Sequence, residues 1–306
     1  MAGGGGFLYG LGMAGPTQAE GVSRREVVRV TPEGALATRA DLVAVEEPLE
    51  IRVDGETLAV TMRTPGQDGD LALGFLYAEG VIGGPDDVGS VSHCGRPGDE
   101  GYGNVVDVRS AGGHRIDPGL VLEGTRWAAT TSACGVCGRR TIEGLLSRVS
   151  PVDGGARLTP AALLAAMERL SSSQPIFRRT GGLHAAVAFA ADGAVLAAAE
   201  DIGRHNAVDK VVGALLRLRA LGVARPEGAA PALLAVSGRA GFEIVQKAAA
   251  ARIPIVSSVS APSSLAVDLA HRAGVTLVGF ARGQGFNVYA NTWRIEEGRA
   301  AARPSP

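Results

Sequence analysis

The stretch that decides the fold is LLAVSGRAGFEIVQKAAAARIPIVSSVSAPSSLAVDLAHRAGVTLV, residues 233–278. Three short apolar runs, which we expect to be buried strands, alternate in it with two segments of helical pattern. The expected strands are Leu233–Val236, Ile253–Val256 and Val275–Val278, and the expected helices are Phe242–Ala250 and Ser264–Ala273. Strands that alternate with short helices predict a largely parallel sheet covered by helices on both faces.

The same pattern continues on both sides of this stretch. Upstream, two apolar runs around Asp192-Gly193 predict a hairpin, and a segment with one apolar face predicts a helix. These elements are expected at His184–Ala190, Val195–Ala199 and Asn206–Arg219, and a last strand is expected at Phe286–Tyr289. We therefore predict one α/β domain over residues 175–295.

Residues 24–125 are predicted to form a smaller, β-rich N-terminal domain. Two alternating runs flank Asp54-Gly55, which is a strong signal for a hairpin. The expected strands are Glu26–Val30, Leu49–Val53, Thr57–Met62 and Asn104–Val108, and a short helix is expected at Asp70–Glu79. The predicted fold class is thus α/β, with a β-rich domain before the larger one.

Three further segments complete the predicted organisation. Residues 1–23 are Gly-rich and residues 296–306 form a short tail, and we expect both to be disordered. Residues 126–174 link the two domains with a cysteine-containing loop and helices. In this link, Thr159 as N-cap and Pro160 at the first position predict a helix that runs to Leu170.

Composition excludes several classes of protein. The net charge of the 306 residues is −1 and aromatic residues make up 4%, which argues against a nucleic-acid binder. Three cysteines cannot form a disulfide framework, and their number fits a reducing compartment. The sequence shows neither a basic leader nor an apolar run of membrane-spanning length, so we expect a cytoplasmic protein without a membrane partner.

Small and basic residues follow each expected parallel strand. Ser237-Gly238-Arg239 follows the first, Ser257–Ser264 with Ser260 follows the second, and Gly279–Gly283 with Arg282 follows the third. Ligands of such sheets bind outside the carboxyl ends of the strands, where helix N-termini and arginine attract anions. The pattern favours a site for an anionic, phosphorylated ligand, although ordinary turn chemistry would also use these residues.

Cys134 and Cys137 form a C-x-x-C motif between glycines, followed by two arginines. This setting favours the reactive thiolate. A structural zinc site lacks its second ligand pair, a thioredoxin motif lacks its preceding strand, and a zinc deaminase lacks its H-x-E. Relay of sulfur as a cysteine persulfide fits the motif, and two buried structural cysteines are the alternative.

Two histidines accompany an acidic and basic cluster. His184 begins an expected strand, while Arg204 and His205 lie between a strand and a helix. Either histidine would hold or protonate a ligand near pH 7, or would simply be packed. Asp209-Lys210 is expected to be a solvated face of the following helix.

The chain resembles the FdhD family, the accessory sulfurtransferases of formate dehydrogenase, over residues 24–295. The motifs that carry the resemblance are CGVCG (134–138), TGGLHAA (180–186), EDIGRHNAVDK (200–210), SGRAGFEIVQKAA (237–249), SAPSSLAVDLA (260–270) and GFARGQGFNVY (279–289). EEPLEIRVDGETLAVTMRTPG (46–66) and LALGFLYAEGVI (71–82) fit it as well. The resemblance implies a cytidine-deaminase-like, three-layer C-terminal domain and a homodimer.

The resemblance also implies a function. It implies that Cys134 accepts persulfide sulfur from a cysteine desulfurase, with Cys137 as the second cysteine. The sulfur then goes to molybdenum cofactor in its bis(molybdopterin guanine dinucleotide) form, bound as substrate, for formate dehydrogenase. The cofactor loop of the family matches Phe280, Ala281, Arg282, Gly283, Gln284 and Gly285.

Two other functions remain open at this point. One is a non-catalytic chaperone that shields the molybdenum cofactor, and the other is a zinc hydrolase that uses Cys134, Cys137 and a histidine. The sulfurtransferase interpretation expects no permanently bound metal. Cofactor binding is expected at the residues matched above and also at Ser237, Gly238, Arg239, Ser260, His184, Arg204 and His205.

Overall fold

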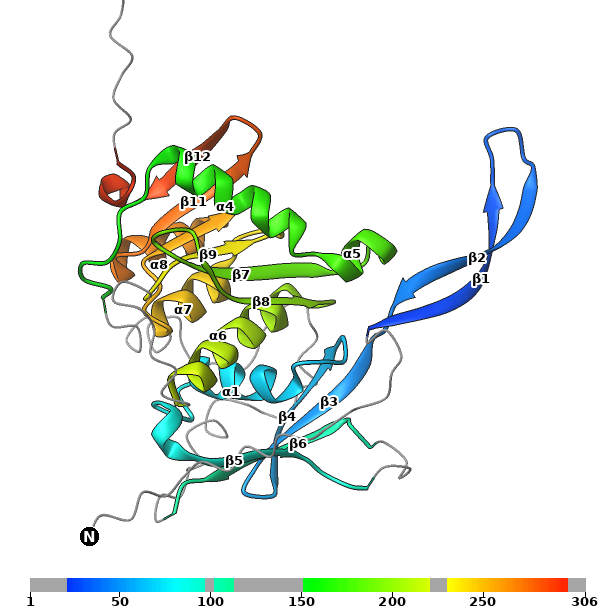
Figure 1. Cartoon of the computed structure of the whole chain (residues 1–306), viewed down its shortest axis with the longest axis horizontal. Helices are drawn as coiled ribbons and strands as arrows, with labels where there is room; N and C mark the ends of the chain where they lie inside the picture. The colour runs from blue at the N-terminus through cyan, green and yellow to red at the C-terminus, as the bar shows by residue number, and fades with distance from the viewer. Residues whose placement is uncertain (1–20, 97–101, 113–150, 221–229, 297–306) are drawn as a thin grey trace, which may run out of the picture.

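The computed structural model describes residues 21–96, 102–112, 151–220 and 230–296. It contains a six-stranded sheet, a four-stranded sheet and a two-stranded arm (Figure 1). Cys134 and Cys137 lie outside the described residues.

The six-stranded sheet has the order β12-β11-β10-β9-β7-β8. Its strands are β7 (His184–Ala190), β8 (Val195–Asp201), β9 (Pro231–Val236), β10 (Ile255–Ser258), β11 (Thr276–Arg282) and β12 (Gly285–Ala290). Only the pairs β9–β10 and β10–β11 are parallel, and the other three pairs are antiparallel. The expectation of a largely parallel sheet is therefore wrong: the hairpins β7–β8 and β11–β12 can join only antiparallel strands, and β7 also runs antiparallel to β9.

Helices cover both faces of this sheet, as expected. One face packs against α4 (Pro160–Ser172), and the other packs against α6 (Arg204–Ala220), α7 (Phe242–Ala250) and α8 (Ser264–Ala273). Thr159 caps α4 as predicted, since its Oγ1 accepts from Ala162 N at 3.1 Å. Although α4 was expected to be a linking helix, its buried residues Leu163, Met167 and Leu170 make it one layer of the domain.

The smaller sheet has the order β4-β3-β6-β5. Its strands are β3 (Glu47–Val53), β4 (Glu56–Arg63), β5 (Val88–His93) and β6 (Val105–Ser110), with η1 (Pro85–Asp87) before β5. The expected hairpin at Asp54-Gly55 is confirmed, and both residues have positive φ, 50° and 88°. This conformation is the one that favours Asp-Gly in a two-residue turn. The helix α1 (Asp68–Ala78) packs its leucines on this sheet.

The strands β1 (Val22–Val30) and β2 (Leu36–Ala44) form an antiparallel arm that extends from the body (Figure 1). Its base touches α5 (Pro175–Thr180). The arm starts two residues before the boundary expected at residue 24, because Val22 is buried and pairs with Ala44. At the other end of the chain, Glu296 still belongs to the fold, since its N–H donates to Leu158 O at 2.9 Å.

Close contact between α1 and α6 joins the two sheets (Figure 1). A Cβ at Gly74 would lie 1.9 Å from Asp209 O, and one at Gly213 would lie 1.9 Å from Asp70 O. Only glycine permits two backbones to approach so closely. The N-terminal sheet is thus fixed against α6, the helix that begins at Arg204. Among the described helices, none is both long and apolar enough to cross a membrane.

Candidate ligand-binding edge

The predicted residues of the C-terminal domain gather where the parallel strands end. In register, His184 at the start of β7 lies opposite Asp201, and β7 runs antiparallel to β9, which ends at Val236. A Cβ on Gly238 would lie 3.1 Å from His184 Nδ1 and 3.6 Å from Arg204 Cδ. The structure thus brings Gly238, His184 and Arg204 into contact distance of one another.

Ser237 fixes the loop after β9 to the neighbouring strand. Its Oγ accepts from Ala185 N at 2.8 Å, and its own N–H donates to Ala185 O at 3.0 Å. Its hydroxyl is therefore already used by the backbone. Arg239, two residues on, is exposed to solvent. Ser237 shapes this part of the edge, while Arg239 offers a free positive charge to an anion that enters from solvent.

Ser258, the last residue of β10, holds the next loop and was not singled out from the sequence. Its Oγ is buried, 2.6 Å from Gly238 O and 3.0 Å from Ser260 O, and it accepts from Ser260 N at 3.0 Å. Ser260 O in turn accepts from Phe280 N at 3.1 Å. One hydroxyl thus ties the loops after β9 and β10 together, and Ser260 links them to β11 at Phe280. The polar end of the run Ser257–Ser260 was the available signal for it.

The segment Phe280–Gly285 was expected to be a loop, which is wrong. Phe280, Ala281 and Arg282 belong to β11, Gly285 begins β12, and the two residues between them make the turn of a hairpin. Antiparallel pairing of Arg282 with Gly285 extends both strands beyond the expected limits. Gly283 has φ 62° in this turn, and all residues from Arg282 to Gly285 are exposed.

Phe280 is held in an unusual conformation. Its φ is 55°, which is uncommon for a bulky side chain, and its side chain is 41% exposed. Such strain persists only where the surroundings impose it, and it concentrates at functional sites. The result is an exposed aromatic ring at the same edge as Ser260 and Gly238.

Burial and neighbouring positive charges change the pKa of His184. Desolvation, Arg204 and, more weakly, Arg239 lower the pKa of His184 below its usual value, against the opposing effect of Asp201. His184 is therefore neutral at pH 7 and carries both a donor and an acceptor nitrogen. Arg204 Nε is buried and makes no hydrogen bond within the described part of the chain. A buried guanidinium N–H without a partner is costly and suits an anionic ligand.

His205 faces a different partner. Its Nε2 lies 3.3 Å from Glu243 Oε2 in the first turn of α7, and both side chains are largely buried. The structure thus ties His205 to α7, whereas its neighbour Arg204 lies beside His184.

Asp209-Lys210 was predicted to be a solvated helix face, which is wrong. Asp209 and Lys210 are 2% and 1% exposed, and eleven consecutive residues of α6, Asn206–Leu216, are buried. Because α6 lies between the six-stranded sheet and α1, it has no solvated face over this length. Each charge has a buried partner: Lys210 Nζ lies 2.7 Å from Asp201, and Lys247 Nζ lies 2.7 Å from Asp209. Burial raises the pKa of Asp209 to about 6, against the effect of Lys247.

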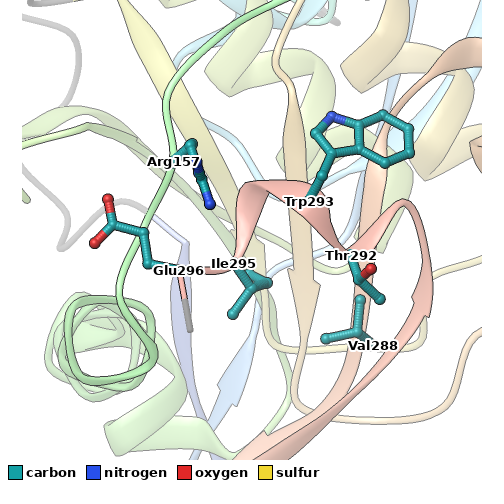
Figure 2. A pocket seen from close by; sticks show the side chains of 6 residues that line it. All are labelled: Arg157, Val288, Thr292, Trp293, Ile295 and Glu296. Carbon is teal, nitrogen blue, oxygen red and sulfur yellow. The ribbon is translucent and has the colours of Figure 1, made fainter. Parts of the chain in front are cut away.

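A cleft of about 640 Å³ lies at the opposite end of the sheet (Figure 2). Its lining residues are Arg157, Val288, Thr292, Trp293, Ile295 and Glu296, the middle two from η2 (Thr292–Arg294). This position is next to the start of β11, where Thr276 Oγ1 bonds to Asn291 O, and no residue predicted for the site lines it. The predicted residues gather at the other end of the sheet.

Among the described residues, no three His, Cys, Asp or Glu side chains come together as a metal site. A zinc hydrolase would use Cys134 and Cys137, which lie outside them.

Comparisons with known proteins agree in pointing to one family. The model of the FdhD/NarQ family matches residues 44–296. A protein from Anaeromyxobacter dehalogenans named sulfur carrier protein FdhD is 64% identical over 273 residues, which cover 86% of this chain and 95% of the relative. A protein of the same name from Streptomyces avermitilis is 47% identical over 285 residues, covering 92% and 98%.

A solved structure shares the fold. It is the crystal structure of a protein from Desulfotalea psychrophila, described as a candidate formate dehydrogenase accessory protein. It superimposes with a TM-score of 0.69 at 24% identity and covers 90% of this chain and 100% of that one. Because the family match spans most of the sequence and the relatives are this similar, the chain belongs to the FdhD/NarQ family.

Proposed function

We propose that this protein is a sulfurtransferase. It takes sulfur from a cysteine desulfurase as a persulfide on Cys134 and delivers it to molybdenum cofactor in its bis(molybdopterin guanine dinucleotide) form, for use by formate dehydrogenase. The observation that carries this proposal is the 64% identity to a protein named sulfur carrier protein, over 95% of that protein's length. The C-x-x-C motif at Cys134 and Cys137 supports it, since relay of sulfur fits its setting.

The sulfur chemistry balances with the two cysteines of the motif. The Cys134 thiolate attacks the terminal sulfur of the desulfurase persulfide, so that a new S–S bond forms and the desulfurase thiolate leaves. The Cys137 thiolate then attacks the inner sulfur of the Cys134 persulfide. This step leaves a Cys134–Cys137 disulfide and releases the terminal sulfur as sulfide, the two thiols having supplied two electrons. An external dithiol reduces the disulfide before the next cycle.

The edge of the six-stranded sheet is the proposed binding site of the cofactor, which is substrate here. Three strand spacings of ~4.8 Å separate β11 from β7, so the edge offers about 14 Å to an elongated ligand. Phe280 presents a ring on which a guanine base stacks, while Arg204 and neutral His184 bind its phosphates. Ser237, Gly238 and Ser260 shape the backbone between these two ends, and Arg239 and Arg282 add positive charge from solvent.

We further infer the finer expectations of the family resemblance. They are a cytidine-deaminase-like domain, supported by the three layers of helix, sheet and helix, a homodimer, a cytoplasmic location and the absence of a permanently bound metal. The shielding of the cofactor by this edge alone is the competing function, and it needs no chemistry at Cys134.

Intact mass spectrometry tests the relay. The full-length protein is incubated with a cysteine desulfurase and cysteine, next to the variants Cys134→Ala and Cys137→Ala. We expect a gain of about one sulfur atom (~32 Da) that a reductant removes in Cys137→Ala, a smaller gain in the wild type, where Cys137 discharges the persulfide, and no gain in Cys134→Ala. A gain that survives in Cys134→Ala would move the carrier role elsewhere. Absence of any gain in protein that still binds cofactor would replace the relay with the chaperone function.

A further inference from the structure

A buried carboxylate organises the turn that carries Arg204. Asp201, the last residue of β8, has no exposed surface. Its Oδ1 accepts from Gly203 N at 2.8 Å and from Asn206 Nδ2 at 3.0 Å. Gly203 lies in the turn between β8 and α6 and Asn206 in the first turn of α6, so this carboxylate is bonded on each side of Arg204.

The other oxygen of the same carboxylate reaches the N-terminal domain. Asp201 Oδ2 accepts from Thr64 N at 3.2 Å and lies 2.7 Å from Lys210 Nζ. Lys210 Nζ also donates to Thr64 O at 2.8 Å. Both backbone groups of Thr64, directly after β4, therefore end in one buried ion pair.

Two further hydrogen bonds connect the end of β4 to the segment from β8 to α6. Thr64 Oγ1 accepts from Ile202 N at 3.2 Å, and Asn206 Nδ2 donates to Met62 O at 2.7 Å. The end of β4 and the β8–α6 turn are thus joined along their length. Arg204 directly follows this turn as the first residue of α6 and belongs to the C-terminal domain.

The free energy of burying two charges distinguishes a stabilising role of the Asp201–Lys210 ion pair from a positioning role. Removing two charges from water costs about as much as their attraction returns, so two apolar side chains of similar size would hold the domains together equally well. Apolar side chains, however, have no directional bonds with which to orient a turn. The ion pair is therefore better explained by geometry than by stability.

We propose that Asp201 and Lys210 are positioning residues for Arg204. Through them, the end of β4 sets the direction in which the Arg204 guanidinium faces the ligand edge. The N-terminal domain thereby takes part in binding an anion that it does not touch. This inference rests on the proposed function for the nature of the ligand, but not for the orientation of Arg204.

The chain supplies a matched control. Asp209 and Lys247 form a second buried ion pair, with Nζ 2.7 and 2.9 Å from the two carboxylate oxygens. This pair links α6 to α7 beside the Phe75 ring, one helical turn beyond the Arg204 turn. Asp209→Asn/Lys247→Met removes as many buried charges as Asp201→Asn/Lys210→Met does, and each pair has one of its charges on α6.

A double-mutant cycle tests the coupling. Guanosine diphosphate is titrated calorimetrically into the full-length protein, the network variant Asp201→Asn/Lys210→Met and the control variant, each with and without Arg204→Ala. We expect Arg204→Ala to weaken binding about ten-fold in the wild type and in the control, as for a lost charged hydrogen bond. In the network variant we expect a further loss of less than about two-fold, because Arg204 is already misplaced. A full ten-fold loss in the network variant, or the same loss of coupling in the control, would overturn the proposal.

A second readout does not depend on the nucleotide. Arg204 lowers the pKa of His184, so Arg204→Ala raises the pKa of His184 when the guanidinium is in place. NMR titration of His184 should show this rise in the wild type and the control, and none in the network variant. A rise of equal size in all three contradicts positioning. If the wild type fails to bind guanosine diphosphate, the proposed ligand is wrong, and the NMR titration alone decides the positioning role.

A milder variant covers the case in which the network variant does not fold. Thr64→Val removes the hydroxyl, which accepts from Ile202 N and donates to Val45 O at 3.0 Å, and it keeps the ion pair. We expect it to fold and to reduce the effect of Arg204→Ala on the pKa of His184. An unchanged effect would contradict the proposal.

Discussion

The two ends of the six-stranded sheet differ in how their polar groups are used. At the end next to the cleft, Arg294 is 1% exposed and donates to the carbonyl oxygens of Val152, Gly154 and Gly274. Asn291 there donates to Ala270 O and Val275 O. At the opposite end, Arg204 Nε is buried without a described hydrogen-bond partner, and Phe280 exposes its ring at a positive φ.

This difference makes the end without the cleft the better candidate for a site. The cleft lies beside buried groups that already satisfy one another, which is what structure alone requires. The other end retains an unsatisfied cation and a strained aromatic residue, both of which cost stability and need a functional reason. The following predictions test this contrast, starting with the largest expected effect.

Arg294→Met should strongly destabilise the protein. The substitution leaves the buried carbonyl oxygen of Val152 and the less buried ones of Gly154 and Gly274 without their donor, and a buried group of this kind costs about 1–3 kcal/mol. We expect the free energy of unfolding to fall by about 3 kcal/mol or more, measured by urea denaturation. A loss below about 1 kcal/mol would show that the Arg294 end is not built for stability.

Phe280→Ala should weaken nucleotide binding without a comparable change in stability. Loss of base stacking costs about 1–3 kcal/mol, so we expect the affinity for guanosine diphosphate to fall about ten-fold in calorimetry. Alanine keeps the same strained φ of 55°, so the folded state gains no relief. Trp293→Ala is the matched control, since Trp293 is also an exposed aromatic side chain, 57% exposed, but lines the cleft. Equal losses in both variants would remove the distinction between the two ends.

The pH dependence of stability should show the smallest effect. The pKa of His184 is lowered in the folded state, so the unfolded chain binds the proton more readily as the pH falls below the usual histidine value. Stability should therefore decrease between pH 7 and pH 5, and His184→Gln should make this decrease smaller. Urea midpoints at several pH values measure it. A steeper decrease in His184→Gln would contradict a neutral His184.

Sequence patterns predicted the local elements well because each follows from nearby residues. The helices at Phe242–Ala250 and Ser264–Ala273 and the turn at Asp54-Gly55 are confirmed at the expected positions. The hairpin between β11 and β12 was missed, since the pairing of Arg282 with Gly285 depends on a partner strand and not on local preference.

The candidate site was predicted only in part, because some of its features follow from nearby residues and others from contacts between distant ones. The glycines, serines and arginines after the strands marked the edge, because strand ends are visible in sequence. The burial of Asp209 and Lys210 was not visible, since it results from α1 packing on α6 through Gly74 and Gly213, which are far apart in sequence. Only the three-dimensional contact shows that Thr64 reaches Asp201.

Hydrogen–deuterium exchange of the full-length protein, with and without guanosine diphosphate, tests the central claim most directly. The account predicts slower exchange of backbone amides in residues 201–206, 237–241 and 279–285, at the end of the sheet that holds Arg204 and Phe280. It predicts unchanged exchange in residues 288–296, which include five of the six residues that line the cleft. Protection confined to residues 288–296 would contradict it and would assign the ligand to the cleft instead.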